Sequence, residues 1–114
     1  MILLQTGDIP TPDELEILKS PTGSHVSIIQ TVSTDWIRIG TLMKFDGELR
    51  TMDAIEANHP RDVYGCVREL FKRWLRNEAQ VDPSWKNLIT LLKDCELASC
   101  AELVEKILQD QKRL

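Results

Sequence analysis

Apolar residues recur at helical spacing in several segments of this chain, and no segment alternates strictly between apolar and polar residues as a half-buried strand would. In the clearest segment, residues 67–76, the large apolar side chains fall on one face of a helix with 3.6 residues per turn: Val67, Leu70, Phe71, Trp74 and Leu75. Such an amphipathic helix needs other elements to cover its apolar face. Similar spacing over residues 26–43, 49–55, 85–92 and 100–108 therefore predicts an all-α antiparallel bundle of five or six short helices.

Cap-forming residues and helix breakers divide the first part of the chain. Thr11 followed by Pro12 and two acidic residues is typical of a helix start, and residues 20–23, Ser-Pro-Thr-Gly, end this short helix. A long helix is expected over residues 25–44. Its β-branched residues weaken helical structure, and the cap formers at 33–35 predict a kink there.

Proline and glycine also mark boundaries in the second half of the chain. A helix over residues 48–58 is expected to end before Pro60, because the residue that precedes proline avoids the helical conformation. A short element should begin at Arg61 and run into the helix over 67–76. Gly65 is predicted to be the joint between the two.

Length and composition indicate one globular domain. The chain has 114 residues, of which 42% are hydrophobic and 28% charged, and these are ordinary values for a soluble domain. Its first residues lack the basic start and long apolar stretch of a signal peptide, and no run approaches the roughly 20 apolar residues that span a bilayer. We therefore expect a cytoplasmic protein with an N-terminal extension over residues 1–24, containing a short helix, and a main domain over residues 25–114.

Few residues suit metal binding or catalysis. Cys66, Cys95 and Cys100 match no zinc pattern and are expected to be buried free thiols. The two histidines, His25 and His59, lie beside helix boundaries and not near other potential ligands. An enzyme would have to use Cys66 as a nucleophile, but the sequence offers no convincing base and no glycine-rich loop for an oxyanion or a phosphate. We expect no enzyme activity, no metal, no cofactor and no small-molecule substrate.

Four motifs, in this order, resemble the death domain family. They are D-W-x-x-x-G-x-x-M at 35–43, M-D-A-I-E-A-N-H-P-R-D-V at 52–63, L-F-K-R-W-L at 70–75, and S-W-K-N-L-I-T-L-L-K at 84–93 followed by A-E-L-V at 101–104. The resemblance covers about residues 26–110 and implies a six-helix Greek-key bundle, the death fold, in which residues 61–63 begin a short third helix. Within the family, the similarity to the Fas-associated adaptor type rests on Asp35-Trp36, Pro60-Arg61, residues 67–69 and Asp94-Cys95.

The tryptophans are expected to lie in the core, because each stands at helical spacing among leucines and isoleucines. Gly40 lies one turn after Trp36, where the missing side chain would let a neighbouring helix come close. The predicted core consists of Trp36, Ile39, Leu49, Ile55, Leu70, Phe71, Trp74, Leu88, Leu92 and Val104.

Two segments carry opposite charge. Residues 46–58 have four acidic residues and one basic residue, a net charge of −3, whereas residues 61–76 have five basic and two acidic residues, a net charge of +3. The predicted acidic patch is Asp46, Glu48, Asp53 and Glu56. The predicted basic patch is Arg61, Arg68, Lys72, Arg73 and Arg76. Within it, Arg68, Lys72 and Arg76 recur every four residues and form a stripe, which we call the basic stripe, and Glu69 can form a surface pair with Arg73.

The family resemblance implies homotypic assembly in apoptotic or innate-immune signalling. Unlike patches on one molecule would allow a head-to-tail contact that repeats, so the expected partners are other death-domain proteins, including copies of this chain. Three alternatives remain at this stage: a face that only keeps the protein soluble, a nucleic-acid-binding helix over 67–76, and an amphipathic membrane helix. A net charge of −4 disfavours nucleic acid, and the need for Phe71 and Trp74 in the core disfavours the membrane.

Overall fold

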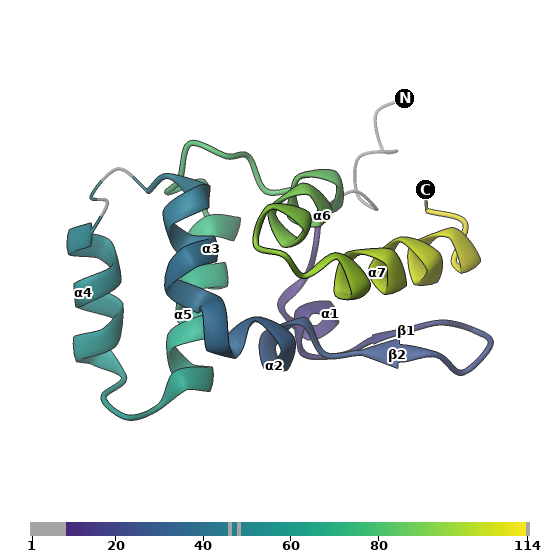
Figure 1. The fold of residues 1–114 in the computed structure, drawn as a ribbon, viewed down its shortest axis with the longest axis horizontal. Helices are drawn as coiled ribbons and strands as arrows, with labels where there is room; N and C mark the ends of the chain where they lie inside the picture. Colours follow the sequence, from purple (N-terminus) through teal and green to yellow (C-terminus); the bar gives the residue numbers. More distant parts are fainter. Residues whose placement is uncertain (1–8, 46, 48, 114) are drawn as a thin grey trace.

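The computed structural model describes residues 9–45, 47 and 49–113, and for Leu49 it describes the backbone alone. In this part of the chain, short helices pack into a bundle beside one small ribbon of two strands (Figure 1). The elements in chain order are α1 (Pro12–Glu16), β1 (Leu18–Lys19), β2 (His25–Val26), α2 (Ile28–Val32), the 3-10 helix η2 (Ser33–Asp35), α3 (Trp36–Met43), α4 (Leu49–Asn58), α5 (Val63–Leu75), α6 (Trp85–Asp94) and α7 (Ala98–Asp110). The predicted all-α fold is confirmed.

The ribbon of β1 and β2 was not predicted. Its strands are antiparallel, with Leu18 opposite Val26 and Lys19 opposite His25. Two residues per strand are too few for an alternating pattern to stand out in a sequence. Because His25 and Val26 belong to this ribbon, the long helix expected over 25–44 begins instead at Ile28.

The predicted kink in this long helix is present, and local hydrogen bonds explain it. The Ser27 hydroxyl caps α2 by accepting a bond from the Gln30 amide at 3.2 Å, and the Thr31 and Ser33 hydroxyls donate to backbone carbonyls of the preceding turn at 2.8 Å. These side chains compete with the regular helical ladder. The chain tightens into η2 and then continues as α3, which ends at Met43 and is capped by Lys44 in a left-handed conformation with φ of 60°.

The prediction of a joint at Gly65 is wrong, because α5 is one continuous helix from Val63. Asp62 caps it by accepting a hydrogen bond from the Gly65 amide at 2.9 Å. A Cβ atom at position 65 would lie 2.4 Å from Asp62 Oδ2 and 2.7 Å from His59 Nδ1. Glycine at this position therefore lets the α4–α5 loop fold back against the start of α5. The short third helix that the family resemblance implied to begin at 61–63 is likewise not a separate element: Arg61 is left-handed, with φ of 59°, Asp62 caps α5, and Val63 is the first residue of α5.

The core lies between two groups of helices. Helices α3, α4 and α5 pack against one another, while α6 and α7 form a pair that reaches the first group through α3 (Figure 1). Of the predicted core, Leu49 lies outside the side chains that the structure describes, and the other members are buried: Trp36, Ile39, Ile55, Leu70, Phe71, Trp74, Leu88, Leu92 and Val104. Trp85 is buried as well. Gly40 is the close-approach point between helices, since a Cβ there would lie 2.6 Å from Met52 Sδ.

The N-terminal segment packs onto this same core. The Thr11 hydroxyl accepts a bond from the Glu14 amide, the Glu14 carboxylate bonds back to Thr11, and this capping box starts α1. Leu15 and Leu18 are each only 1% exposed. The chain end holds the segment from the other side, because the Ser20 hydroxyl donates to Asp110 at 2.8 Å. Over the described residues, no helix combines the length and apolar character needed to cross a membrane.

Candidate protein-interaction face on helix α5

The basic stripe runs along the exposed side of α5. Arg68, Lys72 and Arg76 are all exposed, whereas the opposite side of the helix is buried in the core. The local sequence explains this orientation, since residues four apart fall on one side of a helix and the apolar residues occupy the other. The stripe also extends to the C-terminal end of α5, where the helix dipole favours positive charge.

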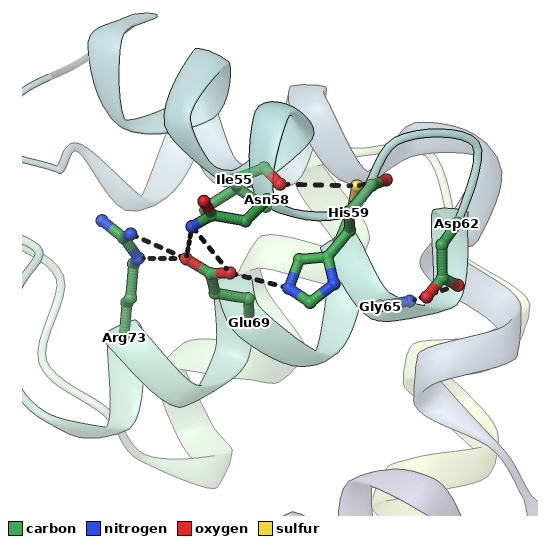
Figure 2. A network of polar contacts seen from close by, with 8 residues as sticks. Ile55, Asn58, His59, Asp62, Gly65, Glu69 and Arg73 are labelled. Carbon is green, nitrogen blue, oxygen red and sulfur yellow. Dashed lines mark hydrogen bonds and ion pairs between the residues drawn. The ribbon is translucent and has the colours of Figure 1, made fainter.

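Arg73 lies apart from the stripe, in a polar network centred on Glu69 (Figure 2). The Glu69 carboxylate accepts bonds from Arg73 Nε at 2.9 Å and from His59 Nε2 at 2.7 Å, and the Asn58 amide approaches it at 3.3 Å. Arg73 Nη2 lies 2.7 Å from the same carboxylate. Burial favours the neutral acid, but the bonds from Arg73, His59 and Asn58 together lower the pKa of Glu69 below its ordinary value.

This network ties two helices together. Asn58 is the last residue of α4 and His59 follows it, whereas Glu69 and Arg73 lie on α5 (Figure 2). The predicted Glu69–Arg73 pair is therefore present, but it is more than a surface pair, because the two side chains are only 17% and 23% exposed. The positive charge of Arg73 is compensated inside the molecule.

The remaining basic side chains differ in their partners. Arg68 is bound by Glu16 of α1, with Nε 2.6 Å and Nη2 3.2 Å from the two carboxylate oxygens, and these bonds raise the pKa of Arg68. Arg76 lies 2.9 Å from Glu78, within the loop that follows α5. Lys72 and Arg61 form no ion pair with any residue that the structure describes.

Two hollows flank the basic stripe. One, of about 540 Å³, lies toward the α4–α5 loop and is lined by His59, Asp62 and the stripe itself. The other is a groove of about 280 Å³ between α5 and α1, where Leu15 and Phe71 form part of the wall. Arg68 and Lys72 line both hollows, so they form the ridge between them.

An exposed apolar patch adjoins the start of α5. Ile37 of α3 and Val63 and Tyr64 of α5 are each more than 40% exposed, and all three line a third hollow, of about 780 Å³. Tyr64 lies one turn before Arg68, so the apolar patch continues the basic stripe along the same helix. The sequence pattern does not reveal this patch, because it places Val63 in the short element expected from Arg61 and Ile37 in the middle of a long helix.

The acidic patch lies on the neighbouring helix α4. Its members Asp53 and Glu56 are exposed, whereas Asp46 and Glu48 lie outside the described residues. No ion pair joins Asp53 or Glu56 to a basic residue of α5 in the part of the chain that the structure covers. Exposed acidic side chains on α4 and exposed basic side chains on α5 therefore remain available for contacts on one molecule.

The three cysteines are free and buried. Burial, followed by the nearby charges of Glu56, Asp62 and Glu69, raises the pKa of the Cys66 thiol, and burial likewise raises the pKa of Cys95 and Cys100. A nucleophilic cysteine needs a lowered pKa and access to solvent. The surroundings of Cys66 therefore give it neither of these properties. Among the described residues, no three His, Cys, Asp or Glu side chains come together as a metal site would require.

Sequence reasoning missed the tertiary partners of this face. Glu16 is 52 positions away from Arg68, and Asn58 and His59 were assigned only to a helix end. The single usable signal was the i,i+4 spacing of Glu69 and Arg73. Contacts between distant segments leave no comparable periodic signal in one sequence.

Comparisons with known proteins agree with the fold and with the motifs. The family model described as "Death domain" matches residues 25–108. The chain is 33% identical over 79 residues to the FAS-associated death domain protein of Mus musculus, an alignment that covers 69% of this chain and 37% of the relative. It is 28% identical over 82 residues to the protein of the same name from Homo sapiens, covering 72% of this chain and 38% of the relative. The chain thus spans little more than a third of the length of these relatives, and no solved structure matches it significantly. The matched residues, the helical architecture and the four motifs together show that the chain belongs to the death domain family, whose members are protein-interaction modules.

Proposed function

We propose that this chain is a non-catalytic, cytoplasmic module that assembles with other death domains, including copies of itself, in apoptotic or innate-immune signal transduction. Membership of the death domain family supports the class of partner. The observation that carries the mode of assembly is that Lys72 on α5 and Asp53 and Glu56 on α4 are exposed and form no ion pair with a described residue.

Unlike patches on one molecule favour a head-to-tail contact. The basic stripe of one copy would face the acidic patch of the next, and a contact of this kind repeats instead of closing as a symmetric dimer. The contact would also bury the exposed apolar patch at Ile37, Val63 and Tyr64, which lies beside the charges. Charges at an interface set specificity and association rate more than affinity, so each contact is weak and salt-sensitive and gains strength through multivalency.

A protein partner fits this face better than nucleic acid does. The net charge is −4 and the isoelectric point is near 5.1, so the chain as a whole repels phosphate. Single-stranded nucleic acid stacks successive bases on several exposed aromatic side chains, but Phe71 and Trp74 are buried and Tyr64 is the one exposed aromatic residue of α5. Glu16 and Glu69 also compensate Arg68 and Arg73.

Sedimentation velocity across protein concentration and ionic strength tests this proposal. We expect larger species at low salt that dissociate at high salt. Lys72→Glu should weaken self-association by about tenfold, because an attractive charge in the contact becomes repulsive. The melting temperature of the Lys72→Glu variant should stay close to that of the parent chain, because Lys72 is exposed.

The matched control is Lys106→Glu on α7. Lys106 is also exposed and lies outside both patches, so this variant makes the same change in net charge. It should weaken association much less than Lys72→Glu. Equal effects of the two variants would mean that only net charge matters, and monomers that are indifferent to salt would refute assembly between copies of this chain.

A further inference from the structure

The N-terminal arm (residues 9–26) precedes the segment that the family model matches, apart from its last two residues, and it lies against the basic stripe. Helix α1 contacts both α2 and α5, and Leu15 of α1 closes one wall of the groove beside the stripe. The arm therefore covers part of the face through which, on the proposed function, this chain binds an acidic surface.

The contact at the centre of this arrangement joins Glu16 to Arg68. Two carboxylate oxygens of Glu16 meet two nitrogens of the guanidinium, at 2.6 and 3.2 Å, which is the paired geometry that arginine prefers with carboxylates. An acidic side chain of a partner would approach Arg68 in the same manner. While Glu16 is in place, the guanidinium has fewer donors to offer to a partner.

We propose that the N-terminal arm is a built-in competitor for the basic stripe, with Glu16 occupying at Arg68 the place of a partner's carboxylate. The inference rests on the proposed function and names its regulation. A partner gains full access to Arg68 only when Glu16 gives way, so the arm lowers the affinity of the chain in its resting form. The partner class follows from this chemistry: a surface whose carboxylates are placed to replace Glu16.

The arm is held firmly, but its contact with Arg68 is easily displaced. Buried Leu15 and Leu18 anchor the arm in the core, and Glu14 pairs with Arg113 near the end of the chain. The Arg68 and Glu16 side chains are 54% and 42% exposed, and an ion pair this open to water contributes little. Glu16 can therefore leave Arg68 while the arm stays docked, and the arm acts as a graded brake.

Glu16→Gln in the full 114-residue chain tests the inference through self-association measured by sedimentation velocity. Glutamine keeps the length of the side chain and removes its charge. We expect association about two- to fivefold tighter than in the parent chain, the range that follows from losing a weak exposed pair. Glu16 is the last residue of α1, where the helix dipole disfavours a negative charge. The melting temperature of the variant should therefore not fall below that of the parent chain.

Asp13→Asn is the matched control. Asp13 lies on the same helix, its loss changes net charge equally, and it makes no bond to Arg68. It should leave association nearly unchanged. In an Arg68→Gln background, Glu16→Gln should also have no further effect, because the pair that it removes is already absent.

The outcomes separate this inference from the proposed function. If Lys72→Glu weakens association but Glu16→Gln has no effect, or has the same effect as Asp13→Asn, the brake is refuted and the assembly face stands. If Lys72→Glu leaves association unchanged, the basic stripe is not the contact. The arm then competes with no contact, and both the brake and the proposed mode of assembly through the basic stripe are refuted.

Discussion

Trp74 and Trp85 offer a matched pair of substitutions, because both indoles are buried but their hydrogen bonding differs. Trp74 Nε1 donates to the Val81 carbonyl at 2.8 Å, whereas Trp85 Nε1 has no hydrogen-bond partner within the described residues. Val81 belongs to the connection between α5 and α6, and its amide bonds to Met43 at the end of α3. Trp74→Phe therefore removes a bond that holds this connection to the bundle, whereas Trp85→Phe removes an unpaired donor.

The hydrogen bond from Trp74 to Val81 should make Trp74→Phe more destabilising than Trp85→Phe. Both changes delete one ring of a buried side chain and should destabilise the fold by a similar amount, about 1–3 kcal/mol. Trp74→Phe also leaves the Val81 carbonyl without its donor, which costs about 1–2 kcal/mol more because Val81 is only half-buried. Arg113, which lies 5.8 Å from the Trp85 ring, keeps an aromatic partner in the phenylalanine variant.

Thermal unfolding followed by circular dichroism checks this prediction. The melting temperature of a 114-residue domain falls by about 4 °C for each kcal/mol lost from its free energy of unfolding. Trp74→Phe should therefore melt roughly 4–8 °C below Trp85→Phe. Urea unfolding should give the same order, with similar m-values for the two variants. Equal stabilities, or a lower stability for Trp85→Phe, would refute the reasoning from the hydrogen bond.

Three further predictions concern other parts of the molecule. Because the folded chain lowers the pKa of Glu69 below its ordinary value, the ionised carboxylate stabilises the fold at neutral pH, and this stabilisation is lost as the pH falls through the folded pKa. Glu69→Gln should therefore lower the free energy of unfolding by about 1–3 kcal/mol at pH 7 and by less at pH 3, as measured by urea unfolding. A cost that does not change with pH would contradict this. Gly40→Ala should destabilise the fold by about 1–2 kcal/mol, despite the better helix propensity of alanine, because its Cβ would meet Met52 Sδ at 2.6 Å and Leu70 Cδ1 at 3.0 Å and both side chains are buried; a stabilised variant in the same assay would show that the flexible Met52 side chain turns aside. Cys66 should react with a thiol reagent at neutral pH only as fast as the fold opens, because its side chain is buried and burial also raises its pKa; rapid labelling of the folded chain would contradict this.

Much of the fold was predictable because helix formation is largely local. The spacing of Leu70, Phe71 and Trp74 predicted both the helix and its buried face, and the structure buries all three. Cap-forming residues predicted the start of α1 and the kink before α3, because each of them acts on backbone groups within one turn. Gly65 was misjudged because glycine serves equally as a hinge and as a point of close contact, and its neighbours decide between the two.

The candidate site was predictable only in part. The sequence places Arg68, Lys72 and Arg76 on one side of a helix, and this arrangement is present. The state of each charge depends on partners from elsewhere in the chain. Glu69, which also bonds to His59, holds Arg73 within the α4–α5 junction; the i,i+4 spacing predicts the pair with Glu69 but not the bond to His59 that buries it.

What the sequence by itself determined is the set of helices, the residues that they bury, and the opposite charges of two segments. All of these depend on spacing along one element, and spacing can be read from the chain. Only the tertiary structure decided that α1 lies across the basic stripe and that Glu16 neutralises Arg68, while Lys72 one turn further on remains unpaired among the described residues. The physical reason is that an exposed charge acts over a few ångströms, so its effect depends on which distant segment folding brings within reach.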